Sequence, residues 1–155
     1  MSGITGGLAQ LDVLTKRIRK IASGGGGGLL HDLAQAGADE ALTQVHLGFR
    51  KSVDPFGNPW APLKYRDGQP LRHTGVMEGG FEKIVEAAKF FIRNRVFYSV
   101  FHQKGARGRV NKKTGQRGGG IPARKMIPDG SDLGTWKNDI RDAINARLER
   151  FLRGG

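Results

Sequence analysis

The sequence contains no cysteine. Disulfide bridges and metal sites built on thiolates are therefore excluded. It also lacks any apolar run near the ~20 residues that a membrane-spanning helix needs. The first residues have no basic start followed by an apolar stretch, so we expect no signal peptide. These absences predict a protein that is made in a cytoplasm and has no contact with a membrane.

Acidic residues are too few to balance the basic ones. The chain has 26 Lys and Arg against 14 Asp and Glu, a formal charge of +12, and residues 87–128 contain no acid at all. Eleven basic side chains lie in that span: Lys89, Arg93, Arg95, Lys104, Arg107, Arg109, Lys112, Lys113, Arg117, Arg124 and Lys125. This concentration predicts an anionic partner, either nucleic acid or an acidic protein surface. The alternative is a solvated basic loop that only aids solubility.

The 155 residues suffice for one domain with a hydrophobic core. A hydrophobic content of 37% with 26% charged residues is typical of a folded chain. The 25 glycines are clustered, five of them at 24–28 and six between 105 and 120. We therefore expect a single domain over 1–155 with four parts: an amino-terminal helix and glycine-rich joint (1–28), a helix, proline-rich loop and first strands (29–104), a basic arm (105–120), and a returning strand with a carboxy-terminal helix (121–155).

Two amino-terminal stretches have apolar residues at three- and four-residue steps, which predicts helices over 8–21 and 29–50. The glycine run at 24–28 separates them, because consecutive glycines do not remain helical. No Lys-Ser or Lys-Thr follows this run, so it is interpreted as a linker rather than a phosphate-binding loop. We expect the two helices to pack as an antiparallel pair.

Short strands and turns are predicted in the middle of the chain. Residues 54–62 hold three prolines and predict a loop that Trp60 anchors to the core. The β-branched and aromatic residues of 81–93 predict two short strands joined near Ala87, although a helix stays open for the first half. The aromatic stretch 97–103 predicts one or two buried turns of helix.

The last third begins with residues 104–120, which lack periodic apolar residues and predict a long loop or a loosely paired hairpin. Residues 121–127 predict a returning strand, and Pro122 requires that this strand lies at a sheet edge or that the proline is among its first residues. Ser131 or Asp132 is expected to cap a closing helix. The predicted class is α+β, with an amino-terminal helical pair, a small mostly antiparallel sheet with a long basic loop or hairpin arm, and a carboxy-terminal helix.

Four short motifs follow one another along the chain. They are Asp54-Pro-x-Gly-x-Pro-Trp60-x-Pro-Leu63, Leu71-x-x-Thr74-Gly75, Tyr98-x-x-x-His102-Gln103-x-Gly105, and Ile121-Pro-Ala-Arg124. In this order they resemble the signatures of the phage virion-morphogenesis, or tail-completion, family over most of residues 49–152. Members usually continue Pro-Ala-Arg with a proline and an aromatic residue, where this chain has Lys125 and Met126.

The resemblance implies a structural virion protein at the head–tail junction, part of a six-fold ring that joins the tail to the head. The implied partners are copies of the chain itself, tail-tube or tail-terminator subunits, head-connector or portal-adaptor proteins, and DNA in the channel. Two alternatives stay open. One is a free nucleic-acid-binding protein that uses residues 87–128, and the other is a tail-terminator ring that caps the tail tube.

Basic residues are the candidate contacts with protein or DNA: Lys104, Arg107, Arg109, Lys112, Lys113, Arg117 and Arg124. We expect the arm that carries the first six to be disordered in the free subunit and to order against a partner. Arg124 either satisfies buried carbonyl groups or pairs with a carboxylate of a neighbouring subunit.

The remaining motif residues are expected to have structural roles in core and turns: Trp60, Thr74, Gly75, Tyr98 and Gly105. His102 lies near Asn111 and a basic loop, but no carboxylate or second histidine is near it in the sequence to help hold a metal ion. We therefore expect His102 to form a hydrogen bond with the backbone. Because no catalytic or cofactor-binding pattern is present, the sequence predicts a protein that is not an enzyme and holds no cofactor.

Overall fold

The computed structural model describes residue 16 and residues 28–64, 66–129 and 132–153. Its elements are α2 (Leu29–Lys51), α3 (Val76–Gly79), β1 (Phe81–Glu86), β2 (Lys89–Asn94), α4 (Ser99–Lys104) and α5 (Trp136–Arg153). Helices with one small antiparallel sheet confirm the α+β class. The helix predicted over 8–21, its packing against the next helix and the joint at 24–28 lie outside the described residues, apart from Lys16 and Gly28.

Helix α2 confirms the helix predicted over 29–50. Gly28 is its N-cap residue, and the chain leaves the helix at Ser52, which adopts a left-handed conformation with φ 55°. The side chains that face the core are buried and recur at helical spacing: Ala34, Ala38, Ala41, Val45 and Phe49. The apolar stripe therefore fixes which face of the helix turns inward.

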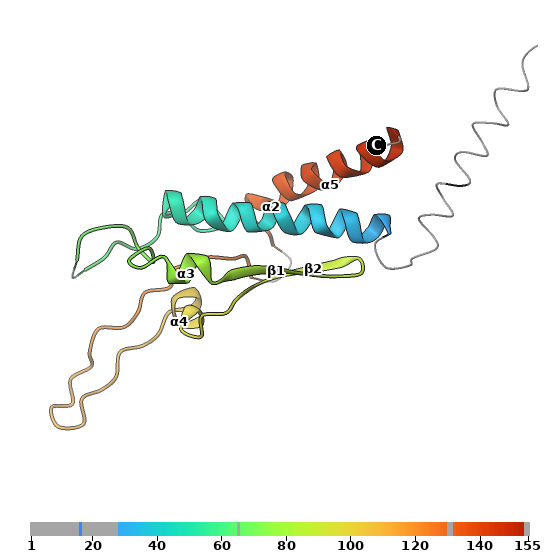
Figure 1. Cartoon of the computed structure of the whole chain (residues 1–155). Helices are drawn as coiled ribbons and strands as arrows, with labels where there is room; N and C mark the ends of the chain where they lie inside the picture. The colour runs from blue at the N-terminus through green and yellow to red at the C-terminus, as the bar shows by residue number, and fades with distance from the viewer. Residues whose placement is uncertain (1–15, 17–27, 65, 130–131, 154–155) are drawn as a thin grey trace, which may run out of the picture.

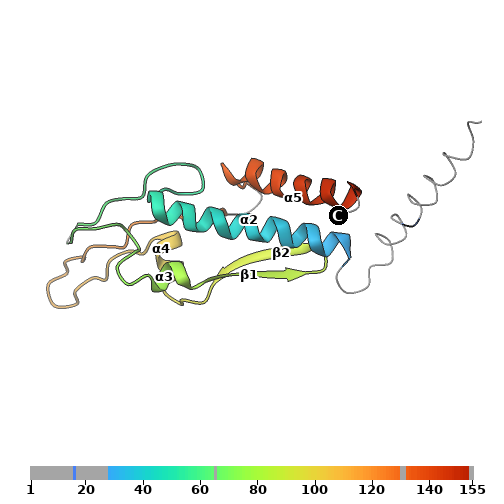
Figure 2. The same ribbon diagram turned by 45° about the horizontal axis from the view of Figure 1, so that its top comes forward.

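Helix α2 forms the middle of three layers, with α5 on one side and the β1–β2 hairpin on the other (Figures 1 and 2). Gly37 shows how closely the layers approach. A Cβ atom at this position would lie 2.9 Å from Cε1 of Phe90 on β2 and 3.2 Å from Cδ1 of Ile144 on α5. Phe49, which is fully buried, packs edge-on against Trp60 and Phe81 with ring centroids 5.2 and 5.8 Å apart. The core therefore lies around α2.

The two strands predicted within 81–93 are confirmed as an antiparallel pair. Their register runs from Phe81 opposite Asn94 to Glu86 opposite Lys89. A two-residue turn joins them, and its first residue, Ala87, has φ 50°. The helix that stayed open for the first half of this stretch is not formed.

No strand forms over 121–127, contrary to the prediction. Ile121 makes a single bridge with Ala106, and the chain then runs on without a strand partner. The backbone groups of this segment form hydrogen bonds with side chains instead. Trp60 Nε1 donates to Lys125 O at 2.8 Å, and the amide of Gln103 bonds the backbone at Met126 and at residue 127. The segment still contacts the core through Met126, which is 4% exposed, but it does so without strand pairing.

Helix α5 begins at Trp136, later than the predicted caps imply. Asp132 Oδ1 instead accepts a hydrogen bond from Gly134 N at 3.0 Å, in the turn before the helix. Ser131 lies outside the described residues. The helix itself confirms the predicted closing helix, and its Trp136 and Ile140 are buried against the core.

Candidate functional site

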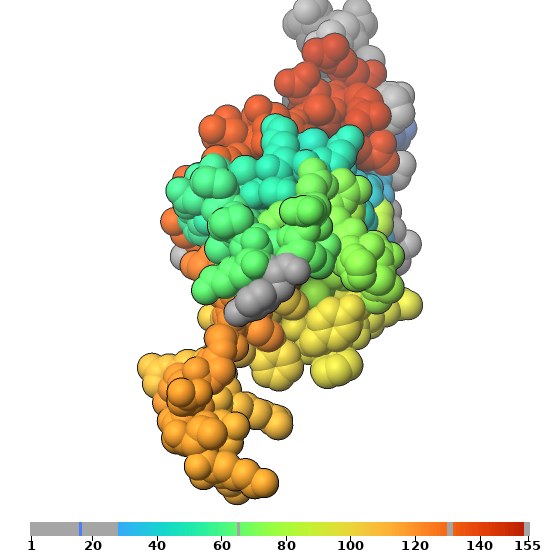
Figure 3. Space-filling view, turned by 90° about the vertical axis from the view of Figure 1, so that its left-hand side faces the viewer, coloured from blue at the N-terminus to red at the C-terminus, as the bar shows by residue number. Residues whose placement is uncertain are grey.

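Residues 106–121 form a hairpin, which confirms the loosely paired alternative for the basic arm. Ala106 and Ile121 exchange two backbone hydrogen bonds of 2.9 and 2.8 Å, and Gly118 N donates to Arg109 O at 2.9 Å. Figures 1 and 3 show the hairpin leaving the body beside α4 and projecting into solvent. Its residues therefore make few contacts with the rest of the domain.

Glycine permits the close approach of the two sides of the hairpin. A Cβ atom at Gly108 would lie 1.8 Å from Gly118 O, a distance that no other residue could tolerate. Gly105, at the base of the hairpin, has φ 75°, a backbone conformation that L side chains rarely adopt. The glycines of this segment thus have geometric roles that composition alone does not reveal.

Six of the seven predicted contact residues are exposed here: Lys104, the last residue of α4 at the base of the hairpin, and Arg107, Arg109, Lys112, Lys113 and Arg117 on the hairpin itself. None of them forms an ion pair within the described residues. Their charges therefore face solvent, where a partner with negative charge can reach them.

An apolar surface lies at the base of the hairpin, on helix α4 and on residue 97 just before this helix. Phe97 is 82% exposed, Val100 44% and Phe101 46%. The prediction that 97–103 forms buried turns is therefore half wrong: the helix is present, but Gln103 is its only buried residue. The aromatic rings of this segment are visible at the surface of the body in Figure 3, next to the hairpin. We call Phe97, Val100 and Phe101 the apolar patch.

Trp60 anchors the proline-rich loop as predicted. It is 6% exposed and packs against Phe49. At the start of the loop, Asp54 Oδ1 accepts hydrogen bonds from the backbone N–H groups of Phe56 and Asn58, both at 2.8 Å. The loop is thus held at both ends, by the backbone hydrogen bonds of the Asp54 carboxylate and by the buried indole of Trp60.

Motif residues far apart in the sequence surround one pocket of about 410 Å³. Its lining residues are Leu63, Arg66, Leu71, His73, Thr74, Met77, Tyr98, His102 and Arg124. We call this the motif pocket. The predicted turn at Thr74 and Gly75 is confirmed, because Gly75 has φ 74° and precedes α3. Each of the four motifs contributes at least one lining residue.

Arg124 is buried, with 5% of its surface exposed, and does not share the exposed basic surface of the hairpin. Its Nε donates to Ala61 O at 2.8 Å and its Nη2 donates to Pro62 O at 3.1 Å. Of the two roles expected for Arg124, the structure therefore shows the bonding to buried carbonyls. These bonds hold the proline-rich loop against residues 121–127.

His102 does not form the predicted side-chain hydrogen bond with the backbone through Nδ1, which is buried and has no partner within the described residues. Its main-chain oxygen accepts a bond from Arg124 N at 2.6 Å. Burial, and then the positive charge of Arg124, lower the pKa of the His102 imidazole below its usual 6.5. Its ring and that of Tyr98 are nearly perpendicular, with centroids 6.4 Å apart.

Gln103 has a structural role that sequence reasoning missed. Its Nε2 donates to Ile127 O at 2.7 Å, and its Oε1 accepts from Met126 N at 2.7 Å. The sequence did offer one signal for this role: Gln103 is an amide next to aromatic residues, in a segment expected to be buried. A buried amide needs hydrogen-bond partners on both its oxygen and its nitrogen.

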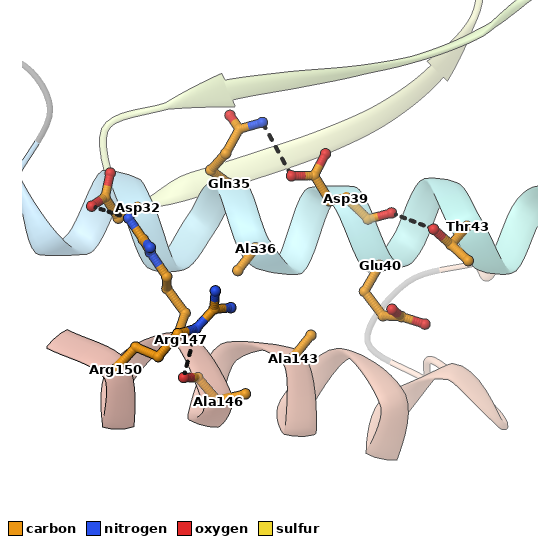
Figure 4. Close-up of a pocket in the computed structure, with 10 residues that line it drawn as sticks. All are labelled: Asp32, Gln35, Ala36, Asp39, Glu40, Thr43, Ala143, Ala146, Arg147 and Arg150. Atoms are coloured by element: carbon orange, nitrogen blue, oxygen red, sulfur yellow. Dashed lines mark hydrogen bonds and ion pairs between the residues drawn. The ribbon is translucent and has the colours of Figure 1, made fainter. Parts of the chain in front are cut away.

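A second hollow, of about 420 Å³, lies between α2 and α5 (Figure 4). Its three acidic residues each have a partner within the protein: Asp32 with Arg147 at 3.0 Å, Asp39 with Lys83, and Glu40 with Gln44 at 2.8 Å. Because these acidic side chains already have partners, we interpret the hollow as a feature of helix packing.

Within the described ranges, no three His, Asp or Glu side chains gather closely enough to hold a metal ion. No helix among the described residues is long and apolar enough to cross a membrane. No protein-family model, no curated protein and no solved structure with which the chain was compared matches it.

Proposed function

We propose that the chain is a structural virion protein of a tailed phage, a tail-completion or neck component that joins the tail to the head as part of a hexameric ring. The proposal starts from the four motifs that resemble the tail-completion family. The convergence of these motifs on one pocket supports it, because residues that share a structural purpose should meet in space.

The observation that carries the proposal is the projecting basic hairpin with the apolar patch at its base. The hairpin has no core of its own, and an exposed apolar cluster of this kind commonly marks a protein–protein contact. Aromatic and arginine side chains are also enriched where such contacts are strongest. An arm beside an apolar surface suits a protein that clasps a neighbouring subunit.

The charge of the hairpin limits what that neighbour can be. Six exposed cations on each copy would repel one another in a closed ring unless opposite charge lies close by. Acidic tail-tube, tail-terminator or head-connector subunits would supply it, and so would DNA in the channel. We favour a protein neighbour, because an arm that projects from the body suits contact with the next ring.

One specific observation favours a second function, binding of single-stranded nucleic acid by the free protein. Phe97 and Phe101 are exposed beside the cations of the hairpin, and bases stack on exposed aromatic rings while cations contact the phosphates. The two functions place different demands on the hairpin, so a single set of variants separates them.

The test replaces Arg107, Arg109, Lys112 and Lys113 with Gln in the phage that encodes the chain. We expect the purified variant to melt at nearly the same temperature as the wild type, because these side chains are exposed and form no ion pair with any described residue. Infected cells should contain separate heads and tails. The matched control replaces Lys137, Arg141, Arg150 and Arg153 of α5, which are also exposed, and should yield normal particles.

Normal particles from the hairpin variant would reject the assembly role of the arm. If that variant assembles normally and the purified protein loses binding to single-stranded DNA, the nucleic-acid function is the correct one. A reconstruction of the particle neck that places the chain outside any ring would reject the ring itself.

A further inference from the structure

Arg124 is a buried cation without a counter-ion among the described residues. Its two described side-chain bonds go to neutral carbonyl oxygens, on Ala61 and Pro62. A buried charge is normally paired with an opposite charge, because its removal from water is otherwise too unfavourable. Burial, and then the positive charge of Arg66, lower the pKa of Arg124. The neighbouring positive charge therefore makes the burial of the Arg124 cation still less favourable.

Among the described residues that line the motif pocket with Arg124, none is acidic. Arg66 and Arg124 are both in its lining, together with the two histidines His73 and His102. The buried Nδ1 of His102 has no hydrogen-bond partner in the described part of the chain. An unpaired buried polar atom is uncommon in folded proteins and calls for a physical explanation. A polar, negatively charged group from another molecule would compensate Arg124 and lie close to the imidazole.

The rest of the pocket wall is apolar. Leu63, Leu71 and Met77 line it, and Met77 is 4% exposed. Leu71 adopts φ 65°, a conformation that is unusual for a bulky residue and costs energy. The surrounding structure must hold this residue in place. A ligand for this pocket would therefore combine an anionic end with a short apolar stem.

We propose that the motif pocket receives an acidic side chain of a partner protein, with the carboxylate beside Arg124 and Arg66 and its methylene groups against Leu71 and Met77. One carboxylate carries a single negative charge, which is enough to act as the counter-ion of the Arg124 cation. A phosphate group carries nearly two charges and is usually bound by several N–H donors. Two nitrogens of Arg124 are already bonded to carbonyl oxygens, which leaves this side chain fewer free N–H groups for a phosphate.

The identity of the partner as a neighbouring virion subunit rests on the proposed function. The preference for a carboxylate does not, because it follows from the charges and walls of the pocket. Binding measured on the purified full chain therefore tests the pocket alone. Particle assembly by the hairpin variant tests the proposed function alone.

The probes are the blocked peptide Ala-Ala-Glu-Ala-Ala, its Gln counterpart, and inorganic phosphate. NMR signals of the His102 imidazole and the Arg124 Nε–H report the binding. We expect the Glu peptide to shift both signals saturably and to raise the pKa of His102, because its charge offsets those of Arg124 and Arg66. The other titratable groups of the pocket are His73 and Tyr98, and their signals are followed in the same spectra. The Gln peptide should leave the His102 and Arg124 signals in place.

Arg66→Gln should weaken the binding of the Glu peptide about two- to five-fold, as for other exposed ion pairs. Arg141→Gln removes the same charge from α5, away from the pocket, and should leave the affinity unchanged. No shift with the Glu peptide, or equal shifts with the Gln peptide, would overturn the proposal. Tighter binding of phosphate at the same two signals would also overturn it, because the site would then select phosphate.

Discussion

The side-chain amide of Gln103 is bonded to the backbone N–H of Met126, with Oε1 2.7 Å from the nitrogen. The same amide donates to Ile127 O at 2.7 Å. One side chain thus satisfies backbone groups that a neighbouring strand would otherwise pair. This contact joins α4 to the segment that leads out of the basic hairpin, so it also fixes the base from which the hairpin projects.

Replacing Gln103 should therefore destabilise the whole domain. Gln103→Leu has a similar size but leaves buried backbone groups unsatisfied, and we expect a loss of about 2–4 kcal/mol in the free energy of unfolding. Gln103→Glu keeps the acceptor and loses the donor. Its stability should recover in part at acidic pH, because a protonated carboxyl can donate to Ile127 O. Chemical denaturation across pH measures both effects, and a Leu variant as stable as the wild type would contradict the role of the amide.

Trp60→Ala should reduce the free energy of unfolding by ~3–5 kcal/mol, the usual loss for a large buried aromatic residue. Trp60→Phe keeps a ring against Phe49 but removes the bond to Lys125 O, so a loss of roughly 1–2 kcal/mol is expected. Thermal unfolding distinguishes the two substitutions. Equal losses would mean that the hydrogen bond, and not the ring packing, holds the loop.

Gly37→Ala tests the three-layer packing around α2. Alanine favours a helix by about 1 kcal/mol relative to glycine, but the added methyl group would press on Phe90 and Ile144. We expect the overlap to dominate and the variant to melt at a lower temperature. Gly79→Ala is the matched control, since its methyl group would meet nothing within 4 Å, and it should be neutral or stabilising. A Gly37 variant as stable as the control would show that the layers are less closely packed.

The free energy of unfolding should depend on pH through His102. Its pKa is lower in the folded protein than the ordinary 6.5, so the unfolded chain binds the proton more readily. Stability is therefore complete above pH 6.5 and decreases as the pH falls from 6.5 toward the pKa of the folded state. His102→Gln should show a smaller decrease over that window in urea titrations. Identical slopes for the two proteins would contradict a depressed pKa at His102.

Local sequence patterns predicted helix α2 and the closing helix, and they favoured the β1–β2 pair, although a helix stayed open for its first half. The apolar spacing from Ala34 to Phe49 defines one helix face, and the β-branched and aromatic residues around Ala87 define two short strands. The basic arm was also determined by its sequence, because an acid-free, glycine-rich segment has no apolar pattern with which to join a core. These properties depend on neighbours along the chain, so they can be read without a structure.

Only the tertiary structure decided which apolar and polar groups meet. Phe97 and Phe101 look like core residues by composition but remain on the surface, whereas Gln103 and Arg124 are buried. Burial of a polar group depends on whether distant partners satisfy it, and those partners here are the backbone of residues 126–127 and the carbonyl oxygens of residues 61–62. Such long-range hydrogen bonds leave no periodic trace in the sequence. The local sequence therefore determined most helices and strands, whereas contacts between distant segments determined the fate of residues 121–127, the motif pocket and the surface from which the arm projects.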